Sequence, residues 1–158
     1  MNGFQILIDK NMANERLEAY WPVPALRDEL LSRAFLKQGG IVSSQAVCFT
    51  TELRGHPAAV VMRVEEKFAS LSRIGYFTIP TCSRRSAVVL SGGVHCASPE
   101  QCGELIEELQ KEVLRGRGID RLYIPLLSEN IIGPVLPDLL RCGFKMHKTE
   151  PVSRLAIL

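Results

Sequence analysis

A histidine follows a pair of glycines near the middle of the chain, a combination that can support catalysis at the end of a strand. The residues directly before His95 are Gly92, Gly93 and Val94. All four come after Ser86–Leu90, a continuous apolar run typical of a buried central strand. Ligands of open α/β sheets bind at such strand ends. His95 could therefore act as a general base, and the three preceding amides could hold an oxyanion or a phosphate. The alternative is a tight turn that carries a hydrogen-bonded histidine.

The cysteines offer other chemistry, which their spacing does not favour. Cys96 adjoins His95, but adjacent residues of an extended chain point apart, so a paired nucleophile and base is not expected. Cys82, His95, Cys96 and Cys102 include no Cys-x-x-Cys or His-x-x-x-His spacing, so we expect buried thiols and no metal. The five cysteines also lack a regular disulfide pattern, which favours a reducing, cytoplasmic location.

Other polar residues each allow a functional and a structural interpretation. Glu52, near a predicted hairpin turn, could act as a base through water or be a solvated carboxylate. Tyr123 could face a substrate groove or pack against a neighbouring strand. Arg84 and Arg85 could form a solvated turn or meet an acidic substrate or a phosphate. Asn130 is placed to cap the helix predicted after it.

Composition limits the classes of partner. The chain has 158 residues, so we expect one domain that spans residues 1–158. Hydrophobic residues make up 46% and charged residues 23%, as in a globular protein. The net charge of +2 is too small to indicate nucleic acid or an anionic membrane as a partner. No apolar run reaches membrane-spanning length, and the first residues lack the features of a secretion signal.

Hydrophobic periodicity predicts a mixture of strands and helices in the first half of the chain. The expected elements are a strand at Phe4–Asp9, a loop or short helix at Asn11–Tyr20, a helix at Ala25–Lys37, and strands at Ser44–Leu53, Ala58–Val64 and Phe68–Ile79. Arg54–Pro57 is a turn by composition, which makes the strands on either side of it a hairpin. The strand at Phe68–Ile79 is expected to break near Gly75 and to end at Pro80, before a basic turn at Thr81–Arg85.

The second half contains the best-specified element, a helix at Pro99–Leu114. Ser98 is its expected N-cap, Pro99 occupies the first helical position, and Gln101 completes a capping box. Apolar residues recur along one side of this helix and glutamates along the other. The remaining predicted elements are a strand at Asp120–Leu127, a short helix at Asn130–Cys142 and a final strand at Val152–Leu158.

This order of elements resembles the GNAT (Gcn5-related N-acyltransferase) superfamily. The long central strand with its Gly-Gly loop, VVLSGGVH, is most similar to the divergent branch of Fem-type and exopolysaccharide-associated acyltransferases. In that family a central strand leads through a phosphate-binding loop into a helix, and a second strand ends near an asparagine. The matching segments are Ser86–Leu90, Gly92–Gln101, Pro99–Leu114, Asp120–Leu127, Asn130 and Gly143–Phe144. The resemblance implies an α/β (α+β) fold in one domain, with a central mixed, mostly antiparallel sheet flanked by helices.

The resemblance also implies an activity and a set of site residues. An N-acyltransferase of this kind uses acetyl-CoA or another acyl-CoA as the donor and an amine as the acceptor, without a metal. Gln101 and Gly103 lie where the family carries its phosphate-loop signature, and Asn130 lies at the position of the family's asparagine. These three residues, together with Gly92–Val94, are the expected donor-binding residues, and His95 is the expected base.

Two departures from the family pattern keep another function open. The signature region contains two glutamates and a single glycine, and Leu139 stands where the family often has a tyrosine general acid. A non-catalytic GNAT-like module for binding or oligomerisation, for example in a homodimer, would not need those residues. Such a module should fill the space between the two central strands with side chains such as Leu126, Leu127 and Phe144. An unrelated α/β protein is the third possibility, and in it those strands would not be parallel neighbours.

Overall fold

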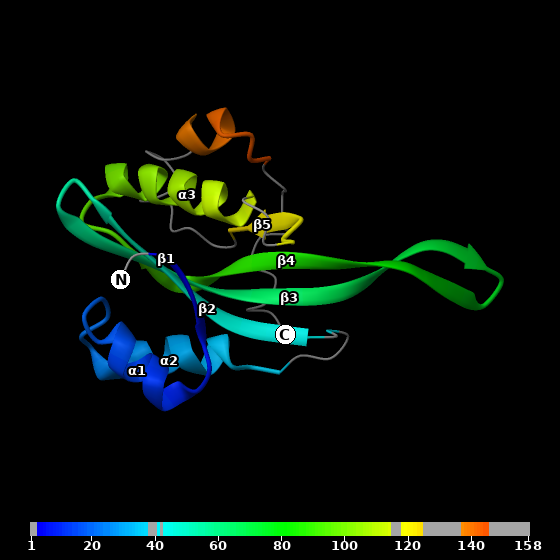
Figure 1. The fold of residues 1–158 in the computed structure, drawn as a ribbon, viewed down its shortest axis with the longest axis horizontal. Helices are drawn as coiled ribbons and strands as arrows, with labels where there is room; N and C mark the ends of the chain where they lie inside the picture. The colour runs from blue at the N-terminus through cyan, green and yellow to red at the C-terminus, as the bar shows by residue number, and fades with distance from the viewer. Residues whose placement is uncertain (1–2, 38–40, 42, 115–117, 125–136, 146–158) are drawn as a thin grey trace, which may run out of the picture.

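One five-stranded sheet, in the order β1-β2-β3-β4-β5, forms the centre of the computed structural model (Figure 1). The structure describes residues 3–37, 41, 43–114, 118–124 and 137–145, with the backbone alone at 68–74, 77–82 and 114. Its elements are β1 (Gly3–Leu7), α1 (Lys10–Leu17), α2 (Pro24–Ala34), β2 (Ser43–Leu53), β3 (His56–Ile74), β4 (Phe77–His95), α3 (Pro99–Leu114) and β5 (Arg121–Tyr123). Residues 137–141 form a further helical segment.

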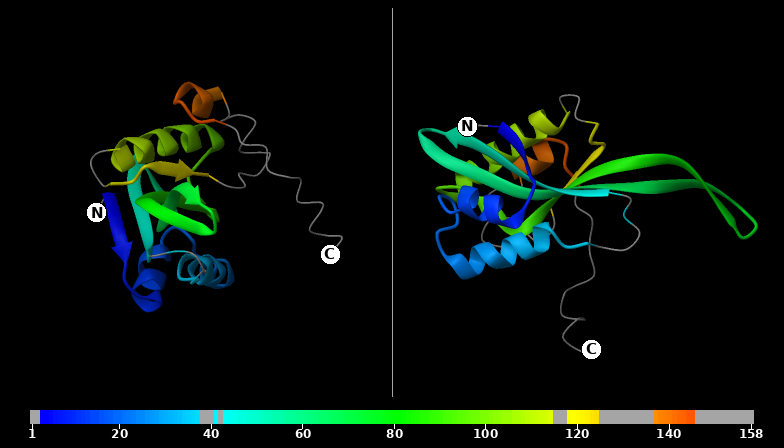
Figure 2. Two further views of the ribbon diagram at one scale, coloured as in Figure 1. Left: turned by 90° about the vertical axis from the view of Figure 1, so that its right-hand side faces the viewer. Right: turned by 60° about the horizontal axis from the view of Figure 1, so that its bottom comes forward.

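The helices lie on both faces of the sheet, so the predicted mixed fold, with helices flanking a central sheet, is confirmed (Figures 1 and 2). Side chains of α1 and α2 pack on one face against Ala46, Cys48 and Val61. On the other face, Leu105 and Leu109 of α3 are completely buried against the sheet. Burial of each such leucine stabilises the fold by about 1.5–3 kcal/mol. Among the described residues, no helix combines the length and apolar character needed to cross a membrane.

The hairpin of β2 and β3 follows directly from its turn residues. Leu53 pairs with His56, so Arg54 and Gly55 form a two-residue loop. Both have positive φ angles, 52° and 79°, as a type I′ turn requires. Glycine adopts this conformation without steric cost. The predicted hairpin is therefore confirmed, although its turn is shorter than expected and β3 continues far beyond Val64.

The strands β3 and β4 form a second, longer hairpin that extends past the rest of the sheet (Figure 1). The chain reverses at Gly75 and Tyr76, and β4 then runs through Pro80 and through the segment predicted as a basic turn. The predicted end of the strand at Pro80 and the turn at 81–85 were therefore wrong. Pro80 is tolerated because it lies between two register shifts, where a missing N–H does not interrupt a regular ladder.

A large bulge interrupts β4 near its end. Val60 pairs with Val94 and Met62 with Val89, so Val61 alone stands opposite the four residues 90–93. The sequence predicted a turn at Gly92 and Gly93, and the structure instead places both glycines inside the strand. The backbone of Gly92 has a φ angle of 74°, which suits glycine. Cross-strand pairing on both sides of the bulge outweighs the local turn signal.

The connection from β4 through α3 to β5 joins two parallel neighbours. Ser86, Ala87 and Val88 pair with Arg121, Leu122 and Tyr123. The bounds of α3 agree with those predicted from its cap and its apolar stripe. The described part of the predicted strand at Asp120–Leu127 is β5, and its last three residues lie outside the described residues. The same holds for the start of the predicted helix at Asn130–Cys142 and for the strand at Val152–Leu158.

Replacement of the two bulge glycines should affect stability unequally. A Cβ atom at Gly93 would lie 2.8 Å from the Val61 carbonyl oxygen and 3.0 Å from that of Leu90, whereas at Gly92 it would meet nothing within 4 Å. We expect Gly93→Ala to lower the free energy of unfolding by about 1–3 kcal/mol because backbone atoms must move. Gly92→Asn should lower it by less than about 1 kcal/mol, because asparagine tolerates positive φ. Urea denaturation of both variants measures the difference, and equal losses would contradict the close approach at Gly93.

Candidate functional site

The end of β4 brings most of the predicted site residues to one place. Gly92 and Gly93 lie in the bulge, and Val94 and His95 complete the strand directly before α3. Two carbonyl groups of the bulge are held by side chains from other elements. Nε1 of Trp21 donates to the Gly92 oxygen at 3.1 Å, and Nη1 of Arg33 donates to the Ser91 oxygen at 3.2 Å. The peptide planes of the bulge are thereby fixed in orientation.

His95 is part of an aromatic cluster, which we define as Tyr20, Trp21 and His95. The imidazole centroid lies 5.7 Å from the Tyr20 ring and 5.8 Å from the Trp21 ring, both in edge-to-face geometry. The Tyr20 and Trp21 rings are 6.1 Å apart. Neither Tyr20 nor Trp21 was predicted from the sequence, since both precede α2 in a segment without a distinctive pattern. Only the fold shows that this segment meets the end of β4.

The environment of His95 favours the neutral form of its imidazole. Burial lowers the pKa of His95, because desolvation disfavours the charged imidazolium. Burial likewise raises the pKa of Tyr20, whose hydroxyl is hydrogen-bonded to Thr50. A neutral imidazole can accept a proton, and aromatic faces attract a cationic group that approaches them. The cluster could therefore receive an ammonium group and remove its proton.

The predicted donor-binding residues of α3 serve the helix itself. The side-chain oxygen of Gln101 accepts a hydrogen bond from the backbone N–H of Ala97 at 3.3 Å. The backbone N–H of Gln101 donates to the Ser98 carbonyl at 3.1 Å. Gln101 thus completes the start of the helix, one residue away from the predicted capping box. Gly103 is buried within the helix, and Asn130 lies outside the described residues.

One of the two glutamates in the signature region is paired with another element. Glu104 accepts from the Arg54 guanidinium at the β2–β3 turn and forms an ion pair with it. The other, Glu100, lies exposed in the first turn of α3. Its negative charge would oppose a phosphate at this helix N-terminus, although the helix dipole would favour one.

Cys96 lies on the α3 side of the strand end, away from the aromatic cluster. It packs with Val94 against Cys102 and Ile106. Hydrogen bonds from the Cys102 thiol and from the Ser98 backbone N–H lower the pKa of Cys96 to about 7. Cys102 is fully buried, and both this contact and its burial raise its pKa, so it stays protonated. Within the described part of the chain, no group of three or more histidine, cysteine or acidic side chains could hold a metal ion.

The α3 side of the region between β4 and β5 is filled with apolar groups. A buried cluster of Cys102, Ile106 and Leu139 is covered by Ile124 and Phe144. Leu139, for which the sequence resemblance suggested the position of a tyrosine, is therefore a core residue. The predicted filling residue Phe144 is present there, and Leu126 and Leu127 lie outside the described residues.

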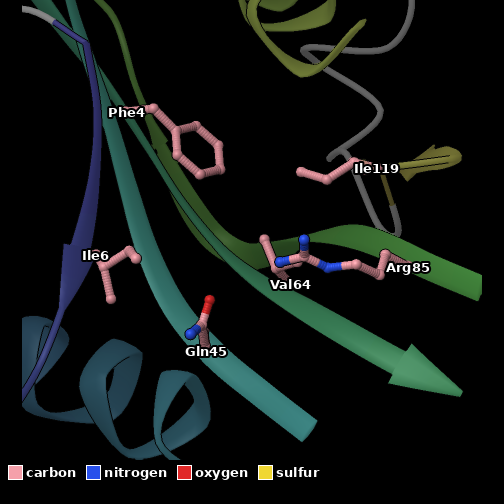
Figure 3. A pocket seen from close by; sticks show the side chains of 6 residues that line it. All are labelled: Phe4, Ile6, Gln45, Val64, Arg85 and Ile119. Carbon is pink, nitrogen blue, oxygen red and sulfur yellow. The ribbon is translucent and has the colours of Figure 1, made fainter. Parts of the chain in front are cut away.

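The remaining polar candidates lie on three different strands, β2, β4 and β5. Glu52 is exposed on β2, and the hydroxyl of Tyr123 accepts from Arg121 at 3.1 Å. Arg84 and Arg85 lie in β4 and line two different hollows of the sheet. The hollow at Arg85 has a volume of about 430 Å³ and is mostly apolar (Figure 3). It is lined by Phe4, Ile6, Gln45, Val64, Arg85 and Ile119.

Among the cysteines whose side chains the structure describes, Cys96 should have the thiol that is most reactive near neutral pH. At pH 7 about half of it is thiolate, compared with a few per cent for an ordinary cysteine. We expect Cys102→Ala to raise the midpoint of the alkylation profile by about 1 pH unit, because the hydrogen bond to the thiolate is lost. Iodoacetamide labelling followed by peptide mass spectrometry measures this, with Cys142→Ala as the control. An unchanged midpoint in Cys102→Ala would contradict the thiol–thiol hydrogen bond.

The buried histidine should make stability depend on pH in a defined direction. Since the folded pKa of His95 is lower than the unfolded value of 6.5, the unfolded state binds protons more readily. The free energy of unfolding should therefore fall as the pH drops through about 6.5, and His95→Gln should show a weaker fall. Denaturant titrations at pH 7.5 and 5.5, with an NMR titration of the imidazole, measure both quantities. An imidazole pKa above 6.5 in the folded protein would refute this assignment.

Comparisons of the chain with protein-family models, with curated proteins and with solved structures found no match. A function for this protein must therefore be argued from the geometry of its own residues.

Proposed function

We propose that the chain is a GNAT-like N-acyltransferase that moves an acyl group from acetyl-CoA, or a related acyl donor, to an amine. The observation that carries the proposal is the bulge at the end of β4, with a neutral His95 directly after it and aromatic side chains around that histidine. A strand followed by a helix and a parallel neighbouring strand is the arrangement that the sequence resemblance implies.

The reaction follows from these residues. The imidazole of His95 takes a proton from the ammonium of the acceptor, directly or through water. The amine nitrogen then bonds to the thioester carbonyl carbon, and the oxyanion that forms needs hydrogen-bond donors, for which the amides of Gly92–Val94 are the candidates. The carbon–sulfur bond then breaks, the nitrogen gives up its second proton to the departing thiolate, directly or through water, and the products are an amide and a free thiol. Most of the rate enhancement would come from positioning the two substrates.

The proposal requires a donor site whose phosphate-binding part, at the start of α3, offers little to a phosphate group. The side chain of Gln101 is engaged at Ala97, and Glu100 brings a negative charge to the helix start. The residues at the bulge fit the acyl and thioester end of a donor better than the start of α3 fits a pyrophosphate. A donor with fewer phosphate groups than CoA is therefore part of the proposal.

A second candidate function is supported by the packing on the α3 side. Phe144 and Ile124 cover the buried cluster around Leu139, which is the filling that a non-catalytic GNAT-like module would show. Such a module would bind a ligand or a second copy of itself without chemistry. The two candidates differ in whether His95 affects turnover.

Two measurements on the purified protein test the proposal. A thermal-shift titration with acetyl-CoA, with CoA and ATP as controls, should show saturable stabilisation, by roughly 2.7 kcal/mol at one hundred times the dissociation constant. Release of free thiol from acetyl-CoA with a panel of primary amines then measures turnover. His95→Gln should lower the rate roughly one hundredfold or more without abolishing donor binding, because only proton transfer is lost. His56→Gln, at the exposed start of β3, is the matched control.

Each outcome has a definite consequence. Stabilisation by the donor without turnover, unchanged in His95→Gln, would favour the non-catalytic module. No stabilisation up to millimolar acetyl-CoA would overturn the acyl-CoA enzyme and leave donors of another type to be tested.

A further inference from the structure

A second hollow, with a volume of about 310 Å³, crosses β3, β4 and β5. It lies on the face opposite α3. Ala87 and Val89 point toward α3, and strand alternation therefore turns Ser86 and Val88 to the other side. We name it the charged hollow, and its lining residues are Glu65, Lys67, Arg84, Ser86, Val88, Arg121 and Tyr123.

The strand register places like charges together in the charged hollow. Lys67 of β3 stands directly opposite Arg84 of β4, and Ser86 stands directly opposite Arg121 of β5. Arg84 and Arg121 are therefore diagonal neighbours across adjacent strands. Like charges directly opposite each other destabilise a sheet. Among the described residues, no carboxylate forms an ion pair with Arg84, so this arrangement leaves a concentrated positive charge.

The one carboxylate that lines the charged hollow is already engaged. Glu65 lies 3.4 Å from Nη2 of Arg63 and 3.5 Å from Nζ of Lys67. Arg63 and Glu65 are both buried, and Arg63 also contacts the Ser44 hydroxyl at 3.2 Å. Glu65 is thus shared between Arg63 and Lys67, which leaves Arg84 and Arg121 without a carboxylate from the lining of the hollow. Buried ion pairs contribute little net stability, so stability alone does not account for this pair.

Hydroxyl groups complete the set of donors. Tyr123 and Ser86 line the same hollow, and the Tyr123 hydroxyl contacts Nη1 of Arg121 at 3.1 Å. This contact orients the guanidinium of Arg121. Guanidinium groups bind phosphate oxygens through two parallel hydrogen bonds, and lysine adds a point charge. A phosphate monoester carries nearly two negative charges and three acceptor oxygens, which match the donors and the excess positive charge.

We propose that the charged hollow binds a small molecule that carries a phosphate group, held mainly by Arg84 and Arg121, with Lys67, Ser86 and Tyr123 as supporting contacts. The volume of about 310 Å³ suits a compact ligand. The proposal does not depend on the acyltransferase function, since neither His95 nor the bulge contributes to this hollow.

Isothermal titration calorimetry with pyrophosphate, inorganic phosphate and adenosine monophosphate tests the proposal. We expect saturable binding of at least one of them, and at least tenfold weaker binding in Arg84→Gln and in Arg121→Gln. Arg141→Gln, which removes an exposed arginine of residues 137–141, is the matched control and should bind as the parent does. The ligand-free Arg84→Gln protein should melt at or above the temperature of the parent, because the repulsion with Lys67 is relieved.

Four results would overturn the proposal. The first is that none of the probes binds at 20 mM, and the second is that Arg141→Gln weakens binding as much as Arg84→Gln does. The third is that succinate binds as tightly as the phosphates. The fourth is that a single-stranded oligonucleotide binds more tightly than the phosphates and that Arg84→Gln abolishes this binding. The last of these would identify the charged hollow as a nucleic-acid contact. Lys67→Gln provides a second variant if Arg121→Gln does not fold, and weaker phosphate binding by Lys67→Gln is required.

Discussion

The bulge in β4 is the constraint on which both sides of the molecule depend. Three extra residues in one strand reverse the alternation of side chains, because that alternation has a period of two. Before the bulge, Val89 faces α3. Continued regular alternation would also turn His95 toward α3. The bulge turns Val94 toward α3 instead and places His95 among Tyr20 and Trp21. The aromatic cluster therefore exists because the strand is irregular.

Several elements hold this irregular backbone in place. Arg33 of α2 and Trp21 bind two of its carbonyl groups, and Gly93 lies so close to Val61 that only hydrogen fits as a side chain. The irregular part of β4 is thus fixed by contacts from one face and by the neighbouring strand. A bulge of this kind can direct a side chain or free part of a backbone without loosening the sheet.

The sequence was sufficient where local signals decide the structure. Pro99 at the first turn and an apolar stripe fix α3, and a glycine at positive φ fixes the β2–β3 turn. The sequence was insufficient where pairing between distant segments determines the structure. The glycines of the bulge and Pro80 carry turn signals, but pairing with β3 continues on both sides of them. Trp21 meets Gly92 across 71 residues of sequence, a contact that no periodicity encodes. Gln101 shows a limit of assigning roles by family resemblance. The resemblance implied that Gln101 binds the acyl donor, whereas in the structure its side chain bonds to the backbone at the start of α3.

The charged hollow lies where the long hairpin leaves the sheet, and this position links its charge to the hairpin. The pairing of β2 with β3 ends at Glu66, and that of β5 with β4 begins at Ser86. Within the described residues, the ribbon beyond those points has two strands only. A two-stranded ribbon is marginally stable by itself, so its order depends on its base. Lys67 and Arg84 form the first pair past that base, and their like charges produce a repulsion that the ion pair of Lys67 with Glu65 offsets in part. An anion bound between them would change this repulsion into attraction, so occupation of the hollow and order in the hairpin would favour each other.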